Sequence, residues 1–138
     1  MKSILMILLV FSSQLLSAQK IKKAGIHLLA DKNNGKSYVF GQQAAVNAVW
    51  DAARNYTLKD IDGMMENYSP VFGAQVVEGN KKWLNAMEQI SMAPYRLIPV
   101  KIEDTDETLV LTWSVEDRKW KNGSQQNLDL MEIFTVNQ

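Results

Sequence analysis

Two acidic residues near the end of the chain are the strongest candidates for chemistry. Glu132 and Asp129 lie in the mainly apolar stretch 128–134, which is predicted to be a strand. A carboxylic acid held in an apolar pocket can exchange a proton near neutral pH, because burial disfavours its charged form. Either residue could therefore transfer a proton or bind a ligand. The alternative is an acid at a solvated pocket mouth, or one paired with Arg96 or Arg118.

The preceding hairpin decides which acid faces the core. If Asn122 and Gly123 form a two-residue loop, Lys121 pairs with Ser124 and Glu132 lies on the apolar face. That face would carry Leu111, Trp113, Val115, Leu130, Glu132 and Phe134, and the opposite face Thr112, Ser114, Glu116, Arg118 and Asp129. A bulge would reverse the assignment. We therefore rank Glu132 above Asp129 as the pocket acid and assert no catalytic residue.

The composition argues against several other kinds of site. The chain has no cysteine, which removes disulfides, thiolate catalysis and cysteine-ligated metals. Its one histidine, His27, precedes the predicted domain, so we expect neither a histidine–carboxylate pair nor a metal there. Equal numbers of basic and acidic residues, 15 each, offer no electrostatic basis for nucleic-acid binding. We expect no cofactor.

The N-terminus has the parts of a secretory signal peptide. Lys2 precedes the apolar residues 4–11, a polar break and the small-residue site Leu16-Ser17-Ala18. The apolar stretch is shorter than the ~20 residues that span a bilayer, so no stable membrane insertion is expected. We expect residues 1–18 to be removed and the product to be periplasmic or extracellular. Residues 19–37 show no sustained period and are predicted to form an extended arm.

Hydrophobic periodicity predicts three helices after this arm. The first begins at Ala45, the second is capped by Thr57 with almost no loop before it, and the third is capped by Asn80 and ends before Pro94. A short strand is predicted at residues 71–77. The apolar stripes of these helices contain Val46, Val49, Trp50, Ala53 and Tyr56, then Leu58, Ile61, Met64, Met65 and Tyr68, then Trp83, Leu84, Met87 and Ile90.

Beyond Tyr95 the period changes to two, which predicts antiparallel strands at residues 95–103, 108–120 and 125–136. Pro99 indicates a bulge or an unpaired edge position. Helices followed by a meander are typical of an α+β domain with the helices on one face of the sheet. The aromatic residues on the predicted apolar faces either line a pocket with Glu132 or fill the core; they are Trp50, Tyr68, Trp83 and Trp113.

The order of elements resembles the nuclear transport factor 2-like superfamily, which includes ketosteroid-isomerase-like and SnoaL-like proteins. The resemblance covers about residues 38–138 and includes Tyr56-Thr57-Leu58-Lys59-Asp60-Ile61-Asp62-Gly63 at the helix–helix junction. It implies a curved sheet wrapped around about three helices, a cystatin-like cone whose mouth holds a small molecule, and a homodimer through the sheet. It also implies a further strand after residue 136, without which residues 125–136 would form an unpaired edge.

Ketosteroid isomerases of this superfamily use a carboxylate base after the second helix, a tyrosine on the first helix and a protonated aspartate on a late strand. The base position falls near Val76 and the tyrosine position near Ala52, so only Asp129 resembles one of these groups. We therefore expect an exported protein that binds a small apolar ligand or a partner through a cone-shaped pocket. The alternative is a small isomerase, cyclase or lyase that acts on a hydrophobic substrate by carboxylate acid–base chemistry.

Overall fold

The computed structural model describes residues 22–66 and 73–137. The predicted signal peptide, the start of the arm and Tyr68 lie outside these ranges. The elements are β1 (Lys23–Ile26), β2 (Ser37–Phe40), α2 (Gln43–Leu58), α3 (Ile61–Met65), α4 (Gly73–Ala86), β3 (Met87–Ile102), β4 (Glu107–Trp120) and β5 (Gln125–Asn137). The described strands form one antiparallel sheet in the order β1-β2-β3-β4-β5, which does not close into a barrel. The predicted α+β class is confirmed.

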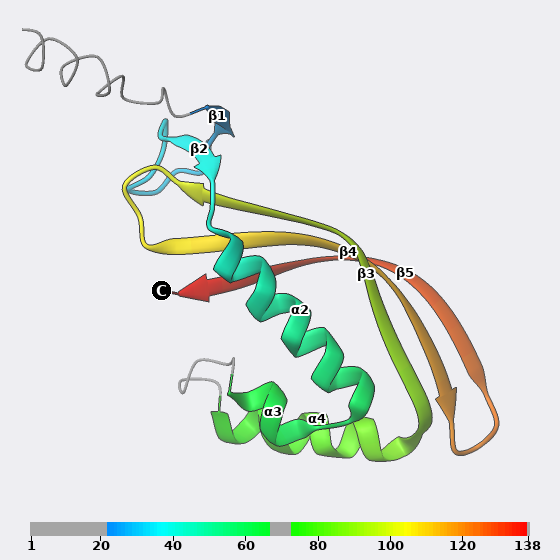
Figure 1. Cartoon of the computed structure of the whole chain (residues 1–138). Helices are drawn as coiled ribbons and strands as arrows, with labels where there is room; N and C mark the ends of the chain where they lie inside the picture. Colours follow the sequence, from blue (N-terminus) through cyan, green and yellow to red (C-terminus); the bar gives the residue numbers. More distant parts are fainter. Residues whose placement is uncertain (1–21, 67–72, 138) are drawn as a thin grey trace, which may run out of the picture.

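The three long strands bend strongly, and the helices lie on the inner side of the bend (Figure 1). Strand β3 has irregularities between Met87 and Gln89 and between Pro94 and Arg96. Such bulges increase the local bend and twist of a strand. Pro99 is tolerated because its side of β3 lies just past the end of β2, where its carbonyl accepts a hydrogen bond from the Gly41 N–H at 2.9 Å.

Helix α2 packs against the sheet through a narrow stripe of small residues. Ala45, Val49 and Ala53 are buried at intervals of one helical turn. Trp50, which the sequence predicted to share this face, is 51% exposed. The first helix therefore forms as expected, but its contact face is narrower than the hydrophobic pattern indicated.

The junction between α2 and α3 is as short as expected, although its cap is a different residue. Helix α2 continues through Thr57, whose hydroxyl oxygen accepts a hydrogen bond from the Met92 N–H at 2.9 Å in β3. Lys59 then adopts a left-handed conformation with φ 57°, which ends α2. Asp60 caps α3 by accepting a hydrogen bond from the Gly63 N–H at 3.0 Å.

The boundary between the third helix and the next strand differs from the prediction. The described part of the expected strand 71–77 is helical, because α4 already includes Gly73; residues 71 and 72 lie outside the description. Helix α4 ends at Ala86, and Met87 and Ile90 belong to β3. Both are buried in a cluster with Met64 and Leu84. The bulge after Met87 places two inward-facing residues three positions apart, which imitates helical spacing.

The N-terminal segment takes part in the sheet. Strands β1 and β2 pair with each other, and β2 pairs with β3 from Tyr38–Ile102 to Phe40–Val100. His27 follows β1 and is buried; its Nδ1 lies 2.9 Å from the Tyr38 hydroxyl oxygen and its Nε2 3.0 Å from Asp31 Oδ2. The hydrogen bond with His27 lowers the pKa of Asp31. This segment lies at the end of the sheet away from α3 and α4 (Figure 1).

Candidate functional site

The β4–β5 hairpin has a three-residue loop, residues 121–123, which is closed by Trp120 and Ser124. The length of this loop sets the pairing register of β4 and β5. Lys119 pairs with Gln125, and the Trp120 N–H donates to the Ser124 carbonyl at 2.9 Å. The Gly123 N–H donates to the Trp120 carbonyl at 2.9 Å, and Gly123 has φ 88°. A turn followed by a glycine at positive φ is typical of three-residue hairpin loops. The predicted pairing of Lys121 with Ser124 is therefore wrong.

The changed register exchanges the two faces of β4. Glu132 pairs with Thr112 and therefore shares its face. The helix-facing side of β4 carries Thr108, Val110, Thr112, Ser114 and Glu116, all buried. Leu111, Trp113 and Val115, which were predicted to face the helices, lie on the outer side. Glu132 thus points inward as expected, but its neighbours on β4 are mainly polar.

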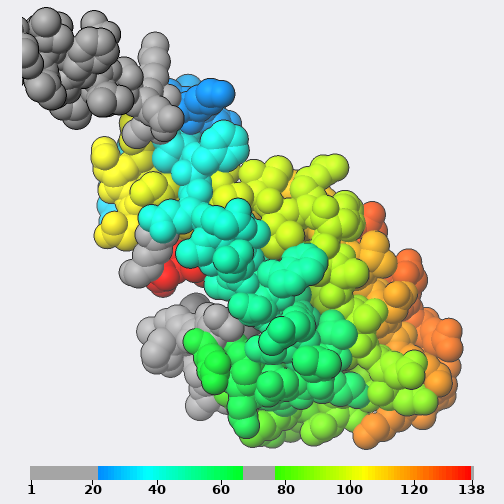
Figure 2. Space-filling view, in the orientation of Figure 1, coloured from blue at the N-terminus to red at the C-terminus, as the bar shows by residue number. Residues whose placement is uncertain are grey.

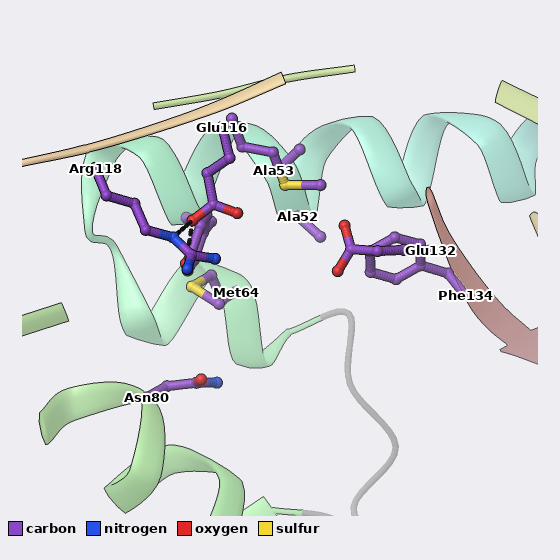
Figure 3. Close-up of a pocket in the computed structure, with 10 residues that line it drawn as sticks. Ala52, Ala53, Met64, Asn80, Glu116, Arg118, Glu132 and Phe134 are labelled. Carbon is purple, nitrogen blue, oxygen red and sulfur yellow. Dashed lines mark hydrogen bonds and ion pairs between the residues drawn. The ribbon is translucent and has the colours of Figure 1, made fainter. Parts of the chain in front are cut away.

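A cavity of about 210 Å³ lies between the helices and the inner side of the bent sheet (Figure 3). The helices and β3 supply two alanines, two methionines, a tyrosine and an asparagine, and the two C-terminal strands supply two glutamates, an arginine and a phenylalanine. The lining residues are Ala52, Ala53, Tyr56, Met64, Asn80, Met92, Glu116, Arg118, Glu132 and Phe134. The cavity therefore combines an apolar wall with two carboxyl groups.

Glu132 enters this cavity from β5. Its Oε2 is buried and has no partner among the described residues. In Figure 3 its carboxyl group points toward Glu116 and Arg118. Burial raises the pKa of Glu132, repulsion from Glu116 raises it further, and attraction to Arg118 opposes both effects. The site therefore favours a proton on Glu132, or a ligand that supplies the missing hydrogen bond.

Glu116, in contrast, is the centre of a hydrogen-bonded network. Its side chain is almost fully buried, and its Oε1 accepts from Arg118 Nε at 2.5 Å and from the Tyr56 hydroxyl at 3.0 Å. The Trp83 indole N–H donates to the Tyr56 oxygen at 2.9 Å. The Arg118 guanidinium also lies 4.9 Å from the centre of the Trp83 ring. This acid is therefore held in place, whereas Glu132 is available.

Tyr56 is kept protonated by the same surroundings. Burial and the neighbouring Glu116 charge raise its pKa to about 12, although the hydrogen bond from Trp83 acts in the opposite direction. A phenol has only one hydrogen to donate. Because Tyr56 donates it to Glu116, the hydroxyl can offer a ligand an acceptor but not a donor in this arrangement.

The three tryptophans predicted for the pocket are not among the described residues that line this cavity. Trp50 is exposed on α2, and Trp83 lies outside the lining, although it contacts Tyr56 and Arg118. Trp113 lies on the outer face, 5.1 Å from the Arg96 guanidinium. Tyr68 is outside the described residues. The structure therefore brings Glu132 to the cavity without the three predicted tryptophans.

Asp129, the second candidate acid, lies on the outer face of the sheet. It is exposed and accepts a hydrogen bond from the Tyr95 hydroxyl at 2.9 Å. The two acids are thus on opposite sides of β5, as strand alternation requires. Of the arginines proposed as partners for a candidate acid, Arg118 lines the cavity but forms its ion pair with Glu116.

Sequence reasoning missed Tyr56, Glu116 and Arg118 as residues of one site. Tyr56 was placed on the apolar face of the first helix, and the two charged residues on the solvent side of a strand. The available signal was the odd loop length, since Gly123 can follow a turn that begins at Trp120. Tyr56 lies one helical turn after Ala52, the position that the resemblance marked for a tyrosine, and both line the cavity. The Val76 side chain is outside the description.

The chain was compared with protein families, curated proteins and solved structures, and no match was found in any of the three. The resemblance to the nuclear transport factor 2-like superfamily therefore stays a prediction. Within residues 22–66 and 73–137, no helix is both long and apolar enough to cross a bilayer. The same residues contain no group of three or more His, Cys, Asp or Glu side chains arranged to hold a metal ion.

Proposed function

We propose that the protein binds a small, mainly apolar molecule in a cone-shaped pocket and recognises its polar group through Glu132. The observation that carries this proposal is the buried Glu132 carboxyl oxygen that has no partner among the described residues but lines a cavity. A protonated Glu132 would donate a hydrogen bond to a carbonyl or ether oxygen of the ligand. Binding would replace the missing hydrogen bond and so offset the cost of burying the acid.

The size of the cavity limits the ligand. A dry protein cavity of about 150 Å³ can hold benzene. The present cavity of about 210 Å³ is therefore suited to a single ring with short substituents rather than a polycyclic molecule. Its alanine, methionine and phenylalanine side chains favour an apolar body, and Glu132 lies where one oxygen-bearing substituent would be recognised.

The cone architecture and the export of the protein are further parts of this proposal, and each has its own support. The strong bend of β3, β4 and β5 around the helices supports a cone architecture (Figure 1). The residue pattern of positions 1–18 supports export, which would expose the pocket to ligands outside the cytoplasm. Neither feature is needed for the binding chemistry of Glu132.

Proton transfer is the second candidate function, favoured by the different surroundings of the two acids. Glu116 is paired with Arg118, whereas burial raises the pKa of the unpaired Glu132. Acids and bases of enzymes are often tuned in this way toward the working pH. Glu132 would take a proton from a hydrophobic substrate and return it at another position, as an isomerase or lyase requires.

Methionine methyl NMR with ring-sized probes tests the binding proposal. Met64 and Met92 line the cavity, whereas Met131 is exposed on the outer face of β5 and serves as an internal control. We expect acetophenone, as a probe, to shift the Met64 and Met92 signals saturably and to leave Met131 unchanged. Toluene should bind less tightly to the wild type, because it lacks the acceptor for Glu132.

The Glu132→Gln variant separates recognition from simple filling of space. A neutral amide retains a donor, so acetophenone should still bind, with its affinity no longer dependent on pH. Glu132→Leu should remove the preference for acetophenone over toluene. Absence of any saturable Met64 or Met92 shift would refute the proposal. Retained binding by Glu132→Gln with loss of substrate turnover would favour proton transfer over recognition alone.

A further inference from the structure

Glu116 is held in place through only one of its two carboxyl oxygens. Its side chain is almost fully buried, and both hydrogen bonds that it accepts from described residues end on Oε1. The donors are Arg118 Nε and the Tyr56 hydroxyl. None of the described residues donates to Oε2, and Figure 3 shows the carboxyl group facing the cavity that it lines. Glu116 can therefore accept a further hydrogen bond from a ligand.

This end of the cavity requires a hydrogen-bond donor on the ligand. As the ion-pair partner of Arg118, Glu116 is a carboxylate, which only accepts hydrogen bonds. The Tyr56 hydroxyl gives its hydrogen to Glu116 and can then only accept. Asn80, which lines the cavity from α4, can do either and does not restrict the choice. A donor that reaches Glu116 would form a charge-assisted hydrogen bond in a largely buried place.

The charges at this end favour a neutral donor over a cationic one. Arg118 Nε lies 2.5 Å from Glu116 Oε1, and the guanidinium is held 4.9 Å from the centre of the Trp83 ring. Arg118 therefore neutralises Glu116, and an ammonium group placed there would meet its positive charge. A hydroxyl group carries no charge, and its oxygen can accept from the remaining N–H groups of Arg118. A hydroxyl thus fits both members of the ion pair.

Glu116 and Glu132 approach the cavity from separate positions along the sheet. Glu132 pairs with Thr112, which lies four residues before Glu116 on the same face of β4. Four residues of a straight strand span about 13 Å. The Glu132 carboxyl group points toward Glu116 across the cavity (Figure 3). A ligand between them can therefore contact one carboxyl group with each end.

The space between the two acids suits an apolar ring. Helix α2 packs mainly against β3 and contacts β5 at few positions, and β5 is visible on either side of it in the space-filling view (Figure 2). The cavity lies in this region, with Ala52 and Ala53 on the helix and Phe134 on β5. These side chains offer no hydrogen bonds, so they would contact the body of a ligand rather than its polar groups.

We propose that the ligand is a ring compound with a hydroxyl group at one end, which donates to Glu116, and a carbonyl group at the other, which accepts from Glu132. This inference rests on the binding proposed for the cavity and adds a second polar contact to it. A ligand with acceptors alone would leave the Glu116 carboxylate without its donor. Hydroxylated aromatic ketones are the simplest members of this class.

Matched probes that differ in one group test the inference in the wild type. 4-Hydroxyacetophenone and 4-methylacetophenone have nearly the same size, and so do their 3-substituted isomers. The Met64 and Met92 methyl signals report binding, with Met131 as the reference, at mildly acidic pH where phenols stay protonated. We expect one hydroxy isomer, the one whose hydroxyl reaches Glu116, to bind about tenfold more tightly than its methyl counterpart.

The outcomes separate this inference from the binding on which it rests. If the methyl compounds bind saturably and neither hydroxyl group improves affinity, the cavity binds ketones as proposed, but the contact with Glu116 is wrong. If no probe shifts Met64 or Met92, both proposals fail. 4-(Aminomethyl)acetophenone carries an ammonium group; tighter binding of this probe than of the hydroxy compounds would overturn the choice of a neutral donor.

The Glu116 carboxyl carbon reports the contact directly by carbon-detected NMR. Its signal should shift with the better hydroxy compound and not with the matched methyl compound, while the signal of the exposed Glu107 on the same strand stays unchanged. An unmoved Glu116 signal would contradict the inference. Glu132→Leu should weaken both compounds but keep the hydroxyl preference, because Glu116 and Arg118 remain in place. Loss of that preference in Glu132→Leu would assign the hydroxyl group to Glu132 and overturn the proposed orientation.

Discussion

Replacing Glu132 with glutamine should stabilise the folded protein above neutral pH. The native site holds a buried carboxyl oxygen that has no partner among the described residues, and burial raises the pKa of Glu132. Because the folded state holds this proton more tightly than the unfolded state, wild-type stability is fully present below the unfolded pKa. It then decreases as the pH rises through the folded pKa. Glutamine carries no charge at any of these pH values and avoids the loss.

The expected gain is about 1 kcal/mol at pH ~8. An unsatisfied buried polar group costs roughly 1–3 kcal/mol, and a charged one costs more; because glutamine removes only the additional cost of the charge and Glu132 is half-buried, the gain belongs at the lower end. At pH ~4, near the ordinary glutamate pKa of about 4.3, most of the gain should disappear. Urea unfolding of both proteins across this pH range measures the difference in free energy of unfolding.

Glu107→Gln is the matched control, since Glu107 is an exposed residue of the neighbouring strand β4. Its substitution should leave the dependence of stability on pH unchanged. The reasoning about Glu132 is refuted if Glu132→Gln is less stable than the wild type above neutral pH. A gain that is equally large at both ends of the pH range would also refute it, because the carboxyl charge would then not be its cause.

Three other predictions concern the network, the helix junction and export. Tyr56→Phe should lower the free energy of unfolding by about 1–2 kcal/mol, because it removes the hydrogen bond to the buried Glu116. If the variant and the wild type unfold at the same urea concentration, this prediction is wrong. In the wild type, the Tyr56 phenol should ionise near pH 12 by ultraviolet titration. Asp60→Ala should lower the stability by about 1 kcal/mol, and Asp60→Asn by less, because asparagine still caps α3. Expression of the full chain in a bacterial host should yield an exported product whose first residue is Gln19 by N-terminal sequencing; an uncleaved product would disprove the signal peptide.

Much of the fold followed from hydrophobic spacing. The α+β class, the nearly loopless junction before Ile61 and the three long strands were all predicted from the period of the apolar residues. The start of β3 was not, because a bulge after Met87 places buried residues at positions 87 and 90, the spacing of a helix. Local pattern cannot distinguish these two arrangements without knowledge of the neighbouring strand.

The site was predictable only in part, because it depends on one turn. Glu132 was chosen as the inward acid, and the structure places it at the cavity. Its neighbours Glu116 and Arg118 were assigned to solvent because a two-residue loop was assumed at Asn122. One additional loop residue shifts the pairing of β4 and β5 by one position. The polar face of β4, rather than its apolar face, then lies on the helix side of the sheet. The burial of Thr112 and Ser114 thus follows from hairpin geometry rather than from residue type.

Direct titration of the Glu132 carboxyl group by carbon-detected NMR tests the central claim most directly. An acid without a partner in a cavity should titrate above the ordinary glutamate value of about 4.3, and its midpoint should move when acetophenone occupies the site. A midpoint at or below the ordinary value, unchanged by the probe, would show that Glu132 is solvated or already paired and would contradict the proposed recognition.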